Sequence, residues 1–453
     1  MDIEKIRNVI LSVNIRIVLF SLFLTIVLDL IYIRIIRNVS FLDYVIIEIV
    51  TFMALDLLIS SLGKRGYFSY LSRNTSLVKR SIRCASRKEK RAMDAKIEGF
   101  LRKEGMDSKI FGTIQMATEI HRFDPPLREN DSHFLVSLEN LGYERNEMTE
   151  RYSDSNDDSR DHITSLDFQN FKKREDVVLE DNSTIWVTGI RVMEGDENSQ
   201  GKKLVLRYAE TGYYRKYSLN RLLHCKFPWE PRYPIEHIID NLESIKGKDF
   251  TFLRGLPSGL GCEVSVITSD GKYIIVQRSH KEAVARFKLI QASSGAYDLE
   301  DFYSSEGKIN ENENHISSLF RGARRELEFE TGIITKYGGT NFSGTQDSML
   351  LLSAYYFVDI NAVNFIFLYK TSLTFEQFKE KFRKEQSKEK WESRRILSLD
   401  IRDIISDSPE FENFMIKHRN ILSDQLIVSI YSLKEYYGSI NRANGLSRRA
   451  EGH

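Results

Sequence analysis

Two long apolar runs near the N-terminus constrain the fold more than any other feature of the sequence. The first covers residues 17–33 and the second covers residues 41–62. Each is about 17–22 residues long, which is enough for a helix to cross ~30 Å of hydrocarbon. Carboxylates interrupt both runs, and Glu48 and Asp56 in the second fall on roughly one helical face. The sequence therefore predicts a two-helix transmembrane hairpin within residues 1–70.

Other interpretations of this apolar segment stay open at the level of sequence. A signal peptide would need a small-residue cleavage site, which is missing here, and a second span follows at once. An amphipathic hairpin lying on the bilayer surface is a further alternative. The carboxylates could line a polar seam or a pore in a homo-oligomer, or they could be interfacial, protonated or paired.

The charges that flank the runs predict the orientation. Lys5, Arg7 and Arg16 precede the first run, a dense basic stretch follows the second, and the connection carries only Arg34 and Arg37. Segments rich in Lys and Arg stay on the cytoplasmic side of a membrane. We therefore expect a multi-pass membrane protein with two spans in the lipid bilayer and both termini in the cytoplasm.

The overall composition argues against several classes of partner and site. The chain has 65 basic and 64 acidic residues and a formal net charge of +1. Since no global positive field exists, nucleic acid is not expected as a partner. Cys84, Cys225 and Cys262 form no CxxC pair, which argues against a disulfide framework and against a cysteine zinc site.

The middle of the chain divides into three predicted parts. Residues 71–143 are expected to form a cytoplasmic helical stalk, because they contain a long stretch rich in Lys, Arg, Glu and Ala. Residues 144–163 have the composition of a polar linker. Residues 164–245 are expected to form a small β-rich module, in which the apolar runs 184–193 and 202–210 flank a polar turn.

Residues 250–437 mix strand and helix patterns and predict an α/β domain, which is followed by a tail at 438–453. A hairpin is expected over 262–279, where two β-branched runs meet at a Ser-Asp-Gly turn. A helix is expected over 316–332 and ends at a glycine. Further strands are expected over 349–359, 362–373 and 391–401, and further helices are expected to begin near residues 373 and 411.

One motif at the end of the predicted helix carries a family resemblance. RRELEFETGI (324–333) resembles the second half of the Nudix box, which reads Arg-Glu-aliphatic, one residue, Glu-Glu, one residue, Gly-aliphatic. The hairpin, the turn SSGAYDLED (293–301) and the stretch WESRRILSL (391–399) are similar to the elements that surround this box. The resemblance covers residues 255–436 and implies a Nudix-like α/β/α sandwich with a mixed sheet.

The resemblance also implies a chemistry. A Nudix hydrolase cleaves an acid anhydride, the pyrophosphate bond of a nucleoside diphosphate derivative, with Mg²⁺ or Mn²⁺. It implies that Glu326 acts as general base or metal ligand and Glu330 as metal ligand, one turn apart on the helix. Arg325 would orient a carboxylate. The candidate substrate-binding residues are Gly295, Phe329 and Glu392.

The sequence departs from the family box at several positions. Phe329 replaces one helix carboxylate, and at strict spacing Ser317 and Glu311 stand where the family has its earlier Glu and its Gly. If Gly295 is the turn glycine, then DFYSSEGKINENENH (301–315) is an insertion. Residues that could replace the missing carboxylate are Glu300, Asp301 and Glu313.

Two functions therefore stay open from the sequence, because a fold does not by itself define an activity. The first is a membrane-anchored Nudix-type hydrolase. The second is a catalytically impaired sensor that binds a nucleotide-like small molecule and acts on a two-helix membrane effector. Phe329 favours the sensor, since an aromatic ring in the metal position could pack against a base.

Overall fold

The structure is a computed structural model of the chain, which divides into the compact units Met1–Arg83 and Cys84–His453. The second unit is the one described below. The described residues are 83–103, 117–140, 183–193, 202–212, 223–226, 232–278, 287–311, 313–333, 348–388 and 393–450.

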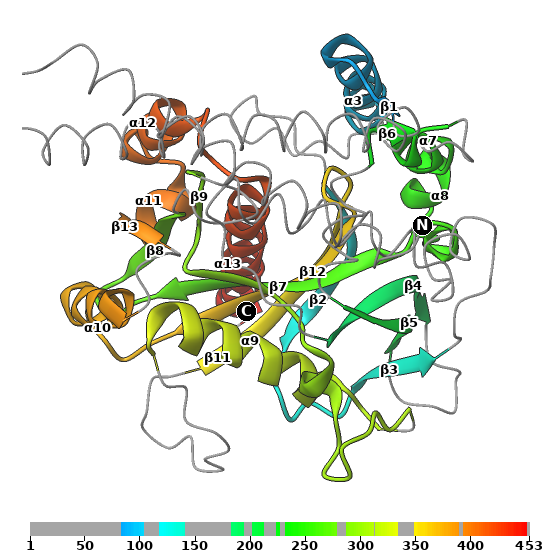
Figure 1. Cartoon of the computed structure of the whole chain (residues 1–453). Coiled ribbons are helices and arrows are strands. Elements are labelled where there is room, and N and C mark those ends of the chain that lie inside the picture. The colour runs from blue at the N-terminus through cyan, green and yellow to red at the C-terminus, as the bar shows by residue number, and fades with distance from the viewer. Residues whose placement is uncertain are drawn as a thin grey trace, which may run out of the picture. The chain divides into compact units, whose positions relative to one another are not determined.

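A large mixed sheet organises the second unit (Figure 1). Its main path has the strand order β2-β11-β12-β7-β4-β5-β3, and β8 and β10 pair with β7 while β9 and β13 pair with β8. The central pair β7–β12 is parallel and the pair β11–β12 is antiparallel. The strands are β2 (Ala117–Leu127), β3 (Phe134–Asn140), β4 (Ser183–Met193), β5 (Lys202–Gly212), β7 (Ser258–Ile267), β8 (Lys272–Arg278), β9 (Leu289–Gln291), β10 (Ser293–Ala296), β11 (Ser348–Phe357), β12 (Ala362–Lys370) and β13 (Ser393–Asp400).

Helices cover both faces of this sheet. Phe365 and Phe367 of β12 belong to the hydrophobic core that contains α9 (Ile316–Thr331) and α10 (Phe375–Lys388). Leu368 belongs to a second core, formed with α11 (Ile401–Ser406), α12 (Pro409–His418) and α13 (Asp424–Ala450). Successive side chains of a strand point to opposite faces, so the sheet is buried on both sides and the architecture is a three-layered α/β/α sandwich.

The predicted elements of the C-terminal half are confirmed. β7 and β8 form the expected hairpin, whose Gly271 has a φ of 77°. Helix α9 ends at Gly332, which has a φ of 68° and donates its N–H to the Glu328 carbonyl over 2.8 Å. Glycine adopts this left-handed conformation without a steric penalty. The predicted tail differs, because α13 continues through it to Ala450.

The N-terminal part of this unit differs from the prediction. Helix α3 (Arg87–Lys103) lies in the predicted stalk, but β2 and β3 in the same stretch join the large sheet. The predicted β-rich module is also part of that sheet, since β4 pairs with β7 through Trp186 and Gly259. A local sequence pattern does not show that a strand pairs with another strand far away in the sequence. The remaining short elements are β1 (Arg83–Cys84), β6 (Cys225–Lys226), α7 (Pro234–Asp240), α8 (Leu242–Lys246), η1 (Thr251–Arg254) and η2 (Leu299–Phe302).

The predicted membrane architecture is corrected. In the part of the chain that the structure describes, no helix is both long and apolar enough to cross a bilayer. Helix α13 has 27 residues, for example, but it carries charges such as Lys434 and Glu435. The described residues therefore give no support to the two-helix transmembrane hairpin or to the two-span membrane localisation. The predicted spans, 17–33 and 41–62, lie outside the described residues, as does the predicted linker 144–163.

The predicted insertion covers the free edge of β3. The Asn314 side chain accepts a hydrogen bond from the Val136 N–H and donates one to the Phe134 carbonyl, both over 3.0 Å. The His315 N–H donates to the Val136 carbonyl over 2.8 Å. An uncovered edge would expose unpaired backbone groups, so this insertion both closes the sheet and anchors the start of α9.

Candidate functional site

Helix α9 packs closely against β10 and the residues that follow it (293–301, called the turn below), and a glycine makes this approach possible. A Cβ atom on Gly295 would lie 2.1 Å from both Cδ and Oε2 of Glu326. No side chain fits at that distance, so residue 295 has to be glycine for the Glu326 carboxylate to lie where it does. Both residues were predicted as site residues from the sequence, and the structure brings them together.

Arg325 connects the helix to the turn. Its Nε and Nη2 donate to Asp301 over 3.0 and 2.8 Å, its Nη1 donates to Glu326 over 2.7 Å, and its Nη2 also donates to the Ala296 carbonyl over 2.9 Å. Asp298 adds an ion pair at 3.1 Å. Burial by itself lowers the pKa of Arg325, but the Asp301 and Glu326 carboxylates raise it above its usual range. The guanidinium therefore holds the turn and α9 as one unit.

Asp301 is the one of the three sequence candidates that pairs with Arg325. It stands six positions after Gly295, which is the spacing of Gly and the earlier Glu in the family box, and it forms the bidentate pair with Arg325. Glu300 and Glu313 are exposed, and Glu313 accepts a hydrogen bond from Asn310. Ser317 is exposed as well. The insertion therefore separates Asp301 from Arg325 in sequence but not in space.

Glu330 is already engaged by protein donors. Its Oε2 accepts the Ser294 N–H over 2.9 Å, and its Oε1 lies 3.3 Å from Nη2 of Arg278. The same Nη2 donates to the Ser294 carbonyl over 2.7 Å. The side chains of Arg278 and Glu330 are only 11% and 12% exposed. Glu330 therefore serves as an internal anchor between α9, β8 and the turn.

Two carboxyl groups at the site have strongly perturbed acidity. Burial raises the pKa of Glu326 to about 7, although Arg325 partly opposes the shift. Burial also raises the pKa of Glu263 on β7 to about 8. Glu263 accepts a hydrogen bond from Asn364 over 2.5 Å and another from Gln291. Such shifts are frequent at functional sites, though structural networks produce them too.

The other predicted site residues do not join this cluster in the described part of the chain. Phe329, which the resemblance aligns with a carboxylate, is 50% exposed. Glu392 lies outside the described residues. Sequence reasoning missed Glu263 and Arg278, which lie within ordinary strand patterns. A charged residue in an apolar alternating run, such as CEVSVI at 262–267, is the signal that could have pointed to Glu263.

The described residues do not fit a resident Mg²⁺ well. Mg²⁺ takes oxygen ligands in near-octahedral geometry, and both oxygens of Glu330 already accept from N–H donors. Oε1 of Glu326 accepts from Arg325. Among the described residues, no group of three or more His, Cys, Asp or Glu side chains is arranged to hold a metal ion. The use of Mg²⁺ or Mn²⁺ thus stays a prediction from the resemblance.

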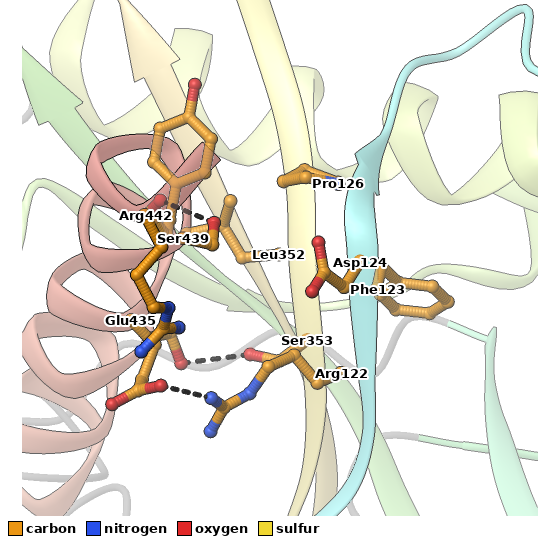
Figure 2. Close-up of a pocket in the computed structure, with 11 residues that line it drawn as sticks. Arg122, Phe123, Asp124, Pro126, Leu352, Ser353, Glu435, Ser439 and Arg442 are labelled. Atoms are coloured by element: carbon orange, nitrogen blue, oxygen red, sulfur yellow. Dashed lines mark hydrogen bonds and ion pairs between the residues drawn. The ribbon is translucent and has the colours of Figure 1, made fainter. Parts of the chain in front are cut away.

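A second polar cleft lies between β2, β11 and α13 (Figure 2). The register of β2 and β11 shifts here, so that residues 123–126 of β2 lie opposite Leu352 of β11. Arg122 donates to Glu435 over 2.6 Å at its lower end. The cavity measures about 40 Å³, which holds only a few water molecules, so it is too small for a nucleotide.

Comparisons with known proteins give little independent support for the family resemblance. No protein-family model matches the sequence, and no curated protein matches it. Among solved structures, the chain is similar to DR0079 from Deinococcus radiodurans, with 12% identity over 36% of this chain and 83% of that one. The TM-score of this match is 0.21, and a similarity at that level carries no argument about fold or function.

Proposed function

We propose that the C-terminal domain binds a nucleotide-like small molecule and does not hydrolyse it. The observation that carries this proposal is the engagement of Glu330, whose two carboxylate oxygens are held by Arg278 and the Ser294 N–H. Hydrolysis of a pyrophosphate bond needs a metal ion that neutralises the phosphates and activates water. A helix carboxylate fixed by a guanidinium is poorly placed to hold such an ion.

Phe329 supports the binding part of the proposal. The resemblance places a third helix carboxylate at this position, and the chain instead presents a half-exposed aromatic ring. Stacking of a base on an aromatic side chain contributes about 1–3 kcal/mol. A half-exposed ring on α9, next to Glu330 in sequence, is therefore suited to a base and not to a metal ion.

Nucleotide binding can be tested on the full-length chain by calorimetry with a panel of nucleoside diphosphate derivatives. Phe329→Ala is expected to weaken binding at least fivefold, because the stacking surface is lost. Ile416→Ala is the matched control, since Ile416 on α12 is also exposed, at 61%. The proposal is wrong if no member of the panel binds, or if both variants bind like the parent chain.

Pyrophosphate hydrolysis is the second candidate function. The pKa of Glu326, raised by burial to about 7, is near the value that suits a general base at neutral pH. The Asp301–Arg325 pair also supplies a part of the box that the sequence alone left open. This candidate requires a metal ion to displace Arg278 from Glu330.

A further inference from the structure

Arg278 lies where a cation is needed between the turn and α9. Its Nη2 atom is 2.7 Å from the Ser294 carbonyl oxygen and 3.3 Å from the Glu330 carboxylate. One nitrogen thus contacts two oxygens that belong to different elements, β10 and α9. A bound metal ion bridges backbone and carboxylate oxygens in the same manner.

The charge of Arg278 also acts on a second carboxyl group. Its positive charge lowers the pKa of Glu263 and so opposes the effect of burial on that residue. Glu263 is 1% exposed and lies directly opposite Ser294 in the β7–β10 pair. The Arg278 charge therefore acts on two buried carboxyl groups, Glu263 of β7 and Glu330 of α9.

We propose that the Arg278 guanidinium replaces a divalent cation in this site, so that a latent metal position between Glu330 and the Ser294 carbonyl is filled by the protein itself. An arginine remains protonated at any physiological pH. A divalent cation next to it would be repelled and would have to compete for the same carboxylate. The inference rests on the proposed function and explains why binding there would need no divalent metal.

The proposal makes an unusual prediction, a gain of metal binding after the loss of a charge. Arg278→Met removes the cation, keeps most of the aliphatic length, and takes the guanidinium away from Glu330 and the Ser294 carbonyl. This variant is expected to bind Mn²⁺ at least tenfold more tightly than the parent chain. Adding Glu330→Gln to Arg278→Met is expected to abolish the gain.

The experiment is a Mn²⁺ titration of the full-length chain, followed by electron paramagnetic resonance of the free ion. Arg321→Met is the matched control, because Arg321 lies on α9, the helix that carries Glu330, and donates to the Tyr303 carbonyl, not to a carboxylate. Circular dichroism establishes that each variant is folded. A folded Arg278→Met chain with no gain in Mn²⁺ affinity overturns the proposal.

A second measurement decides the case even if Arg278→Met does not fold. The parent chain itself is expected to show no Mn²⁺ binding that Glu330→Gln removes. If the parent chain binds Mn²⁺ through Glu330, Arg278 does not fill the position and the proposal is wrong. No nucleotide is present in either titration, so this failure is distinct from a failure of nucleotide binding.

Discussion

At the scale of single residues, the site is a network in which charged groups hold each other. Arg325 joins Asp301 to Glu326, and Arg278 joins Glu330 to the turn. Removing one partner of a buried ion pair leaves an uncompensated charge and typically costs several kcal/mol. The motif residues that resemble catalytic groups are therefore also structural residues in this fold.

Glu263 should make stability depend on pH. Its folded-state pKa is raised by burial from 4.5 to about 8, while in the unfolded chain it stays near the ordinary value. The folded state thus keeps the proton to a higher pH than the unfolded chain does. The contribution of Glu263 to the free energy of unfolding is therefore fully present below about pH 4.5, and it falls as the pH rises towards 8, by up to ~1.4 kcal/mol per pH unit. Denaturant unfolding at pH 5.5 and pH 8 measures the slope.

Glu263→Gln provides the comparison for this pH dependence. The variant lacks the titrating group, so its stability should fall less steeply over the same pH interval. Glu326 contributes a slope of the same sign up to about pH 7 in both chains, which leaves the difference between them to Glu263. Equal slopes for the variant and the parent chain would show that Glu263 is ionised in the fold throughout.

At the scale of elements, the contact between α9 and the turn depends on the missing side chain of Gly295. In Gly295→Ala the new methyl group would meet the Glu326 carboxylate at 2.1 Å, and overpacking of this kind typically costs about 1–3 kcal/mol. Combining it with Glu326→Ala opens space, so the double variant should lose less stability than the sum of the single ones. Thermal unfolding of the four chains tests this, and strict additivity would contradict it.

The insertion makes a separate prediction at this scale. Asn314→Ala leaves the Val136 N–H and the Phe134 carbonyl of β3 without their side-chain partner, and the expected loss is about 1–3 kcal/mol. Asn310→Ala is the control, because the Asn310 amide donates to the exposed Glu313 over 3.0 Å. Urea unfolding that gives the same midpoint for both variants would argue against an edge-closing role.

The sequence predicts local elements well and long-range pairing poorly. The hairpin at β7–β8 and helix α9 are recognisable because their turn and cap residues, Gly271 and Gly332, are local signals. Asp301 could only be offered as one of three candidates, because an insertion separates it from Arg325. Arg278 was missed because its partners are 16 and 52 positions away.

At the scale of the whole molecule, the sheet extends well beyond the region of the family resemblance. β2 pairs with β11, β4 pairs with β7, and Arg324 of α9 bonds to Glu129 over 2.7 Å. A stalk and a separate β module were expected for these strands. The composition favours a stalk for β2, because its charged residues and prolines are not typical of a strand.

The extended sheet predicts that the region of resemblance does not fold alone. A fragment starting at residue 250 would lack the strands that cover β7 and β11, and it would expose core residues such as Leu260. A fragment starting at residue 84 keeps them. Circular dichroism and thermal unfolding should show a cooperative transition only for the longer fragment. A cooperative transition in the shorter one would contradict the single-sheet account.

The central claim is that the site binds a nucleotide-like ligand without cleaving it. The most direct measurement is release of phosphate or nucleoside monophosphate from nucleoside diphosphate derivatives, by the full-length chain with Mg²⁺ or Mn²⁺, beside Glu326→Gln. A site that binds without cleaving gives no release above the Glu326→Gln background from a ligand that calorimetry shows to be bound. Release by the parent chain that disappears in Glu326→Gln would contradict it and establish a hydrolase.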